Sequence, residues 1–320
     1  MAQDTRSHPV DRRRLAMEVV IIGAGAMGCL FAAKLQHSGA SVRLVEVDEP
    51  TVSAIAVRGI EVTCGGLSLS QFVPITRADQ THRSADLIVV FTKGLHTRQA
   101  IDSVRHLLTD TTWVLTLQNG LGNAQVIAQL TDPDRLAVGM TDVPADLAGP
   151  GQVSTADAGE IRFWSYSKAY HPILGEFQNM LCRAGFQAAV DEGVVGHIWE
   201  KVAFNAALNG LCTLLDCRVE LIGMSQDARW IATRAVAECE AVAHRLGIPF
   251  RSDQVLARME EAFMHQADHI ASMLQDRRAG RRTEIESING GVIRLADEMG
   301  VDAPVLKTLY HLVRFSEPSS

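Results

Sequence analysis

The chain has 320 residues, of which 47% are hydrophobic and 21% charged, an ordinary globular composition with enough length for two domains. Its net charge of −7 argues against nucleic acid or an acidic membrane surface as the main partner, because both reward a basic footprint. No apolar run is long enough to span a bilayer.

The first 190 residues alternate strand-like and helix-like segments after a polar leader at 1–16, which we expect to be disordered or a species-specific extension. Continuous apolar runs of strand length are typical of a parallel sheet covered by helices on both faces, and they occur at 18–22, 42–45, 87–92 and 113–117. A helical segment at 29–38 ends at Gly39, a natural C-terminal stop. The pattern predicts a doubly wound α/β, Rossmann-like domain over 17–190.

Two further stretches of this half are rich in strand-forming residues. Residues 59–75 alternate β-branched and small residues around Gly65 and Gly66, which predicts a hairpin-like insertion within the sheet. Residues 139–163 are punctuated by Pro144 and Pro150 and predict more strands.

Beyond about residue 190 the apolar periodicity becomes helical. The pattern predicts an all-helical domain over 191–316, with helices at 195–215, 225–246, 252–275, 283–299 and 303–315. Thr283 followed by Glu286 fits a capping box at the start of the fourth of these helices. The apolar character of this half favours a homodimer.

The cysteines are scattered without Cys-x-x-Cys pairing, at Cys29, Cys64, Cys182, Cys212, Cys217 and Cys239. This distribution favours a reduced, cytoplasmic compartment, with neither a disulfide framework nor a zinc site or other metal centre.

A glycine-rich turn follows the first predicted strand and opens a helix. Its residues are the candidate cofactor loop: Gly23, Ala24, Gly25, Ala26, Met27 and Gly28. In this Gly-x-Gly-x-x-Gly spacing the first glycine makes the turn, the second lets the backbone approach a pyrophosphate, and the third lets helix pack on strand. The helix N-terminus offers unpaired N–H groups to the anion. The alternative is a glycine turn that serves packing alone.

Glu46 closes the second predicted strand and bears on cofactor choice. A carboxylate there accepts hydrogen bonds from the ribose 2′-hydroxyl of NADH and repels the 2′-phosphate of NADPH, and Val47 supplies no cation. The residues therefore favour NADH, although Arg43 or Arg58 could still reach a phosphate. Glu46 could also be a solvated charge at a strand end.

One helical segment of the second half carries a candidate acid. Lys201, Asn205 and Asn209 are spaced i, i+4, i+8 and share one helix face. Their apolar flanks would bury the lysine stem and lower its pKa, which suits a group that protonates a carbonyl oxygen. The alternative is a polar stripe that faces solvent or a domain interface.

Six motifs occur in one order along the chain: the glycine loop, Thr92-Lys93, Gln-Asn-Gly-Leu-Gly at 118–122, the Lys201 helix, Ser-Met-Leu-Gln-Asp at 272–276, and the segment from Thr283 to Gly290. As a set they resemble the ketopantoate reductase family, also called 2-dehydropantoate 2-reductases, over residues 17–316. The resemblance implies a Rossmann-like domain followed by a helical domain, with a cleft between them.

The resemblance also implies roles. Lys201 matches the general acid, and Glu284 matches a glutamate that helps to fix substrate and cofactor. Residues matched to the substrate's carboxylate or hydroxyl are Asn205, Asn209 and Ser272. Residues matched to strand ends near nicotinamide, ribose and substrate are Lys93 and Asn119, and Ala145 matches a backbone contact to the cofactor.

The resemblance implies reduction of a small 2-keto acid with NADPH or NADH. Its leading substrate is ketopantoate, which is reduced to (R)-pantoate in pantothenate biosynthesis. Many family members carry an arginine after the second strand for the NADPH phosphate, where this chain has Val47. Two alternatives stay open: a relative that acts on another 2-keto or 2-hydroxy acid, and a non-catalytic dinucleotide-sensing protein.

Overall fold

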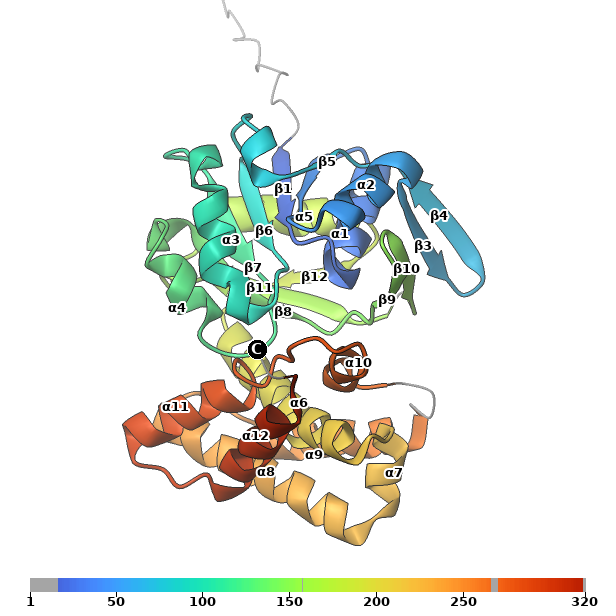
Figure 1. The fold of residues 1–320 in the computed structure, drawn as a ribbon. Helices are drawn as coiled ribbons and strands as arrows, with labels where there is room; N and C mark the ends of the chain where they lie inside the picture. The colour runs from blue at the N-terminus through green and yellow to red at the C-terminus, as the bar shows by residue number, and fades with distance from the viewer. Residues whose placement is uncertain (1–16, 157, 266–269, 319–320) are drawn as a thin grey trace, which may run out of the picture.

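The N-terminal half is a Rossmann-like domain built on two sheets, and the larger of them is the main sheet (Figure 1). The computed structural model of the chain describes residues 17–156, 158–265 and 270–318, so the leader expected at 1–16 lies outside the described residues. Within these ranges eight strands form this sheet, in the order β12-β11-β8-β7-β6-β1-β2-β5. Their bounds are β1 Glu18–Ile22, β2 Ser41–Val45, β5 Ile75–Thr76, β6 Leu87–Val90, β7 Trp113–Thr116, β8 Leu136–Thr141, β11 Glu160–Ser165 and β12 Gln187–Val190. All neighbouring strands are parallel except β8 and β11, which confirms the predicted parallel core.

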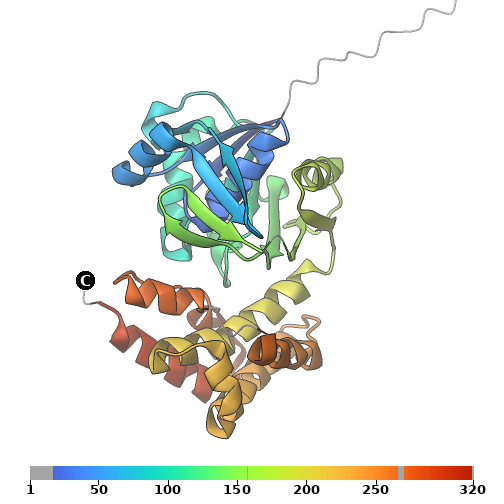
Figure 2. The same ribbon diagram turned by 90° about the vertical axis from the view of Figure 1, so that its right-hand side faces the viewer.

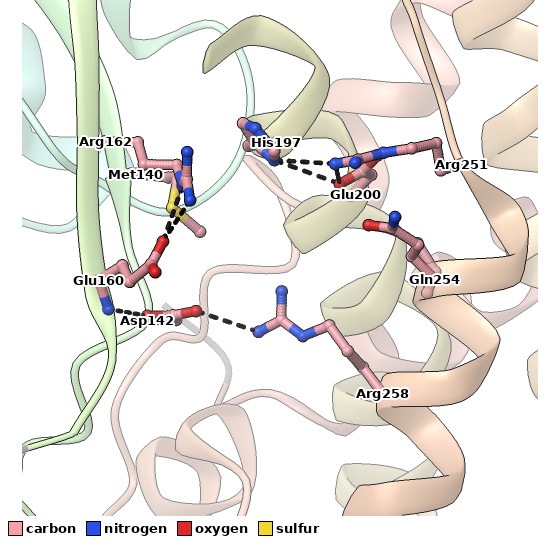
Figure 3. A pocket seen from close by; sticks show the side chains of 10 residues that line it. Met140, Asp142, Glu160, Arg162, His197, Glu200, Arg251, Gln254 and Arg258 are labelled. Carbon is pink, nitrogen blue, oxygen red and sulfur yellow. Dashed lines mark hydrogen bonds and ion pairs between the residues drawn. The ribbon is translucent and has the colours of Figure 1, made fainter. Parts of the chain in front are cut away.

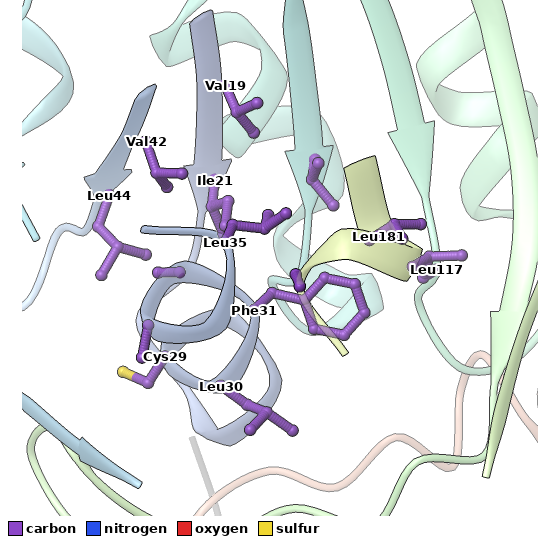
Figure 4. Close-up of a cluster of buried hydrophobic side chains, with 14 of the residues drawn as sticks. Val19, Ile21, Cys29, Leu30, Phe31, Leu35, Val42, Leu44, Leu117 and Leu181 are labelled. Atoms are coloured by element: carbon purple, nitrogen blue, oxygen red, sulfur yellow. The ribbon is translucent and has the colours of Figure 1, made fainter. Parts of the chain in front are cut away.

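Helices cover both faces of this sheet, which explains why its central strands are apolar throughout. Successive side chains of β1 point to opposite faces, so Val19 and Ile21 join one core and Val20 and Ile22 another. Helices α1 (Ala26–His37) and α5 (Pro172–Arg183) pack on the first face, where Phe31 is fully buried (Figure 4). Helices α2 (Glu49–Arg58), α3 (Thr97–Ser103) and α4 (Asn123–Ala128) complete this half, with α3 and α4 packed on the second face.

The hairpin expected at 59–75 forms, but its predicted place within the main sheet is wrong. Strands β3 (Ile60–Cys64) and β4 (Leu67–Gln71) pair with each other and join β9 (Asp146–Gly149) and β10 (Gln152–Thr155) in a separate sheet ordered β4-β3-β10-β9. Along β3 buried and exposed residues alternate, so the strand has one apolar face, which packs beside α1. A sheet with one solvated face suits the surface, whereas the main sheet needs strands that are buried on both sides.

The C-terminal half is helical, as predicted, and its helices are α6 Val194–Leu215, α7 Val219–Met224, α8 Gln226–Arg245, α9 Ser252–His265, α10 Ser272–Arg278, α11 Asn289–Met299 and α12 Pro304–Ser316. Helix α6 runs from the end of β12 into the helical half and is its central element (Figure 2). None of the described helices is both long and apolar enough to cross a membrane.

Two of the predicted helices are wrong in extent. The single helix expected over 252–275 is two helices, α9 and α10, and the backbone of Ala271 just before α10 is not helical, with φ −52° and ψ 135°. The helix expected over 283–299 starts only at Asn289, because the preceding turns fold onto the N-terminal half, where the Leu121 N–H donates to the Ser287 carbonyl at 2.7 Å.

The capping box predicted for Thr283 and Glu286 is also wrong. The Thr283 hydroxyl accepts from the Ile285 N–H at 3.2 Å and donates to Glu317, at the end of α12. The Glu286 carboxylate accepts from the Tyr310 hydroxyl at 2.8 Å instead of reaching back to Thr283.

Candidate active site

The candidate site lies at the carboxyl ends of the parallel strands, on the edge of the sheet that faces the helical half. The glycine loop follows β1, Lys93 follows β6, Asn119 follows β7 and Thr141 ends β8. Strand order reverses between β1 and β6, and in open α/β sheets ligands bind in the crevice at such a point. Parallel pairing thus gathers residues that are far apart in the chain.

The glycine loop has the geometry of a pyrophosphate cradle. Gly23 has φ +99°, and a Cβ there would lie 3.0 Å from the Thr92 nitrogen. A Cβ on Gly28 would lie 1.8 Å from the Gly23 carbonyl oxygen, so the helix packs against its own turn only with glycine there. A Cβ on Gly25 would meet nothing within 4 Å, which leaves open space at the N-terminus of α1. The residues present therefore fit a dinucleotide.

The Glu46 carboxylate is fixed beside this loop. Its Oε2 accepts from the Ala24 N–H at 2.7 Å, and its Oε1 accepts from the N–H groups of Val47 at 2.7 Å and Asp48 at 3.1 Å. Three backbone donors hold the negative charge where the adenosine ribose of a bound dinucleotide would lie.

The arginine that contacts the segment beside Glu46 is Arg77, which no sequence pattern marked. The Arg43 guanidinium donates to the Thr81 hydroxyl at 2.6 Å and to the Arg83 carbonyl at 2.8 Å, so it is held at the sheet edge. Arg77 instead donates to the Val47 carbonyl at 3.1 Å. No local pattern in the sequence connects Arg77 with Val47, since β5 brings them together.

Lys201 projects from α6 toward the strand ends. Its Nζ donates to Oδ1 of Asn119 at 2.7 Å and to the carbonyl oxygen of Thr141. Burial lowers the pKa of the ammonium to about 8, while Asp142 and Glu284 raise it and Arg258 lowers it further. A lysine with such a pKa can give up a proton near neutral pH.

Asn119 connects this lysine with Glu284. Its Nδ2 donates to Oε2 of Glu284 at 3.2 Å, so one amide lies between an ammonium and a carboxylate. Burial raises the pKa of Glu284, and the hydrogen bond from Asn119 and the charge of Lys93 oppose that rise. The structure thus brings Lys201, Asn119 and Glu284 together from α6, the loop after β7 and the turns before α11.

Further residues matched to the substrate or cofactor lie on α6, at the start of α10 and after β8. Asn205 and Asn209 follow Lys201 by about one and two turns of α6, and Asn209 is buried. Ser272 is exposed at the first position of α10, a helix that packs against α6. Ala145 lies between β8 and β9, half-buried against the sheet core.

Lys93 spans the two halves of the chain. Its Nζ forms an ion pair with Oδ1 of Asp276 at 2.6 Å and donates to the Arg282 carbonyl at 3.0 Å. Asp276 is buried and also pairs with Arg281 at 3.0 Å. Asp276 is the last residue of the Ser-Met-Leu-Gln-Asp motif, but no pattern in the sequence predicts its ion pair with Lys93.

A polar pocket of about 230 Å³ lies beside the Lys201, Asn119 and Glu284 group, lined by residues from β8, β11, α6 and α9 (Figure 3). It is lined by Met140, Asp142, Glu160, Arg162, His197, Glu200, Arg251, Gln254, Val255 and Arg258. Asp142 could have been noticed because it follows a strand whose carboxyl end lies at the site edge, whereas nothing in the local sequence marks Arg258.

Comparison with known proteins agrees with this geometry along nearly the whole chain. The family model described as Ketopantoate reductase PanE/ApbA matches residues 19–168, and the model of its C terminal part matches residues 194–317. A 2-dehydropantoate 2-reductase of Streptococcus pyogenes is 30% identical over 94% of this chain and 98% of its own, and one of Pyrococcus abyssi is 30% identical over the same shares.

Among solved structures, D-mandelate dehydrogenase in a ternary complex with NADH and anilino(oxo)acetate superposes with a TM-score of 0.90. It is 29% identical and covers 94% of this chain and 98% of its own. The motifs, the two-part fold and these matches show an NAD(P)H-dependent oxidoreductase, and the chain belongs to the ketopantoate reductase family.

Proposed function

We propose that the chain reduces the keto group of a small 2-keto acid, with ketopantoate as the leading substrate and (R)-pantoate as the product, and that it prefers NADH to NADPH. The observation that carries the proposal is the contact of Lys201 with Asn119, and through it with Glu284, at the strand ends beside the glycine loop. A carbonyl oxygen placed beside this ammonium has a proton donor within hydrogen-bond reach.

The geometry supports a separate role for each part of the site. Gly23, Gly25 and Gly28 would receive the pyrophosphate, and Glu46 would accept from the ribose hydroxyl. When bound, the nicotinamide supplies the hydride that reaches the keto carbon.

Lys201 supplies the proton. The C=O double bond becomes C–OH as hydride joins the carbon and the Lys201 proton joins the oxygen, which leaves a neutral amine. Because Lys201 is held by Asn119 and Thr141, its charge is already oriented when the alkoxide develops, and this kind of preorganised donor is a major source of rate acceleration.

The remaining polar residues would orient the substrate. Asn205 and Asn209 on the Lys201 helix and Ser272 at the start of α10 carry neutral donors and acceptors suited to a carboxylate or hydroxyl. Glu284 would bind a substrate hydroxyl or fix Asn119, and Lys93 and Ala145 would face the cofactor.

A second candidate is a dehydrogenase for another 2-keto or 2-hydroxy acid. The superposition on D-mandelate dehydrogenase supports it, because that protein is as similar in sequence as the reductases are. A non-catalytic sensor of dinucleotides would need the glycine loop but not the Lys201, Asn119 and Glu284 group.

Initial rates with ketopantoate, its analogue without the 4-hydroxyl and benzoylformate, each with NADH and with NADPH, test these functions. We expect the highest kcat/KM with ketopantoate and NADH, since a site built for a hydroxyl loses about 10⁴-fold when it is absent. Highest activity with benzoylformate would favour the second candidate, and no oxidation of either cofactor by any 2-keto acid would favour the sensor.

Two predictions about organisation also stay proposals: domains at 17–190 and 191–316, and a homodimer. Limited proteolysis would test the first by cleavage near residue 190. Sedimentation of the intact chain would test the second by its mass in solution.

A further inference from the structure

An ion pair crosses the polar pocket next to the candidate site (Figure 3). Asp142 directly follows β8 in the N-terminal half, and Arg258 lies on α9 in the helical half. The Arg258 Nη2 and the Asp142 Oδ2 are 3.5 Å apart. The Arg258 guanidinium also lies 5.7 Å from the ring centre of Phe204, which is on α6 one turn after Lys201.

The carboxylate of Asp142 is held in place by the neighbouring strand. Its Oδ1 accepts from the N–H of Glu160, and the Asp142 N–H donates to the Glu160 carbonyl at 3.1 Å. Gly159 approaches so closely that a Cβ there would lie 2.8 Å from the Asp142 carboxylate, at φ +96°. The position of this charge is therefore set by β11 and not by α9.

The residue before Asp142 holds the candidate acid. The Thr141 carbonyl accepts from Nζ of Lys201, and the Thr141 hydroxyl accepts from the Val143 N–H at 3.2 Å. One short segment therefore supplies both an acceptor for the ammonium, at residue 141, and a negative charge next to it, at residue 142.

We propose that Asp142 and Arg258 are positioning residues of the candidate site: Asp142 fixes the segment whose Thr141 carbonyl accepts from Lys201, and the charges of Asp142 and Arg258 act on that ammonium in opposite senses. This inference rests on the proposed role of Lys201 as the proton donor. It adds two residues, one from each half of the chain, so that the charge on Lys201 depends on how the two halves meet.

The charges around Lys201 give the pair opposite effects. Three charged groups act on it from the elements packed around it: Asp142 from the end of β8, Glu284 from the turns before α11 and Arg258 from α9. On its own helix the neighbouring Glu200 is bound by Arg251 at 2.7 Å. Asp142 is the largest of the effects that raise the pKa of Lys201, and Arg258 lowers that pKa.

The test is the pH at which Lys201 becomes reactive. Wild type, Asp142→Asn, Arg258→Gln and Arg258→Lys are each labelled with an amine-reactive reagent across a pH series, and labelling at residue 201 is followed by peptide mass spectrometry. We expect the pH midpoint of labelling to fall in Asp142→Asn and to rise by roughly half a pH unit or more in Arg258→Gln. It should equal the wild-type midpoint in Arg258→Lys. The pH profile of kcat/KM should move in the same directions.

Arg229→Gln is the matched control. Arg229 pairs with Glu260 on α9 and lies 5.1 Å from the ring centre of Phe263, so it has the same kind of contacts as Arg258 without facing Lys201. Its midpoint should equal that of wild type. If Asp142→Asn fails to fold, the upward shift in Arg258→Gln still decides the question.

The inference would be overturned if the labelling midpoints of Asp142→Asn and Arg258→Gln shifted in the same direction. An unchanged midpoint in a folded Arg258→Gln would overturn it as well. The labelling needs no turnover, so a chain inactive on every 2-keto acid still reports on the pair. Failure of the proposed function and failure of this inference are therefore separate results.

Discussion

Nζ of Lys201 lies 2.7 Å from Oδ1 of Asn119, although 82 residues separate the two in the chain. One residue is on the helix that begins the C-terminal half, and the other follows the strand β7 of the main sheet. A change in the angle between the halves must therefore move the two residues together or break this hydrogen bond, which couples the proposed proton donor to the position of the sheet.

Replacing Lys201 by alanine should lower kcat for reduction about 100- to 1,000-fold, because an oriented donor in an enclosed site contributes on this scale. Cofactor affinity, measured by nicotinamide fluorescence titration, should stay near the wild-type value, since the glycine loop is on another element. A variant that retains near-normal turnover would remove Lys201 from the mechanism.

The pH profile should have opposite signs in the two directions of the reaction. Reduction needs the Lys201 ammonium, so kcat/KM should fall as pH rises through about 8, the pKa to which burial lowers this group. Oxidation of the hydroxy acid needs the neutral amine, so its kcat/KM should rise over the same range. Flat profiles in both directions between neutral pH and pH values well above 8 would contradict the assignment of Lys201.

Glu284 should matter for both affinity and rate. In Glu284→Ala the Asn119 amide loses its acceptor and Lys201 loses one of the two carboxylates that raise its pKa, so KM should rise and kcat should fall. Glu284→Gln keeps an oxygen acceptor for Asn119 but not the charge. Its KM should therefore lie between those of wild type and Glu284→Ala, while the midpoint of its pH profile stays below that of wild type. If the melting temperature alone changes, the role of Glu284 is structural.

Much of the fold could be predicted because its signals are local. Continuous apolar runs predict strands that are buried on both faces, and β1 was predicted to the residue. The hairpin β3–β4 was also predicted, but its sheet depends on pairing with β10, about ninety residues later in the chain. The turns at 283–288 contain helix-forming residues, yet contacts with the Asn119–Leu121 loop override that propensity.

The candidate site also combines residues that local patterns predict with residues that only tertiary contacts bring together. The glycine loop and Lys201 stand in local patterns, and the family resemblance supplied the role of Glu284. The acceptor at Thr141, the charge at Asp142 and the cation at Arg258 depend on how β8, α6 and α9 meet. No spacing within the chain encodes such a meeting, so these residues were found only in three dimensions.

Two glycines of the cofactor loop should respond differently to the same change. Gly28→Ala would place a Cβ 1.8 Å from the Gly23 carbonyl oxygen, so it should cost about 1–3 kcal/mol or more of unfolding free energy. Gly25→Ala meets nothing within 4 Å and has an ordinary φ of −74°, so its thermal unfolding should match wild type. Its affinity for the dinucleotide should fall about tenfold or more, because the methyl group occupies space needed by the pyrophosphate. Equal affinities in wild type and Gly25→Ala would show that the loop serves packing alone.

Glu46 should set the preference between the two nicotinamide cofactors. Its carboxylate is fixed by the N–H groups of Ala24, Val47 and Asp48, so it cannot swing away from a 2′-phosphate without losing these bonds. We therefore expect a lower KM for NADH than for NADPH. Glu46→Gln removes the repulsion but keeps an acceptor oxygen, so KM for NADPH should fall severalfold while KM for NADH changes little. Arg77, which donates to the Val47 carbonyl beside Glu46, could then pair with the phosphate, and adding Arg77→Gln should reverse the gain. A wild-type protein with a strong preference for NADPH in parallel assays would show instead that Arg77 already outweighs the fixed carboxylate.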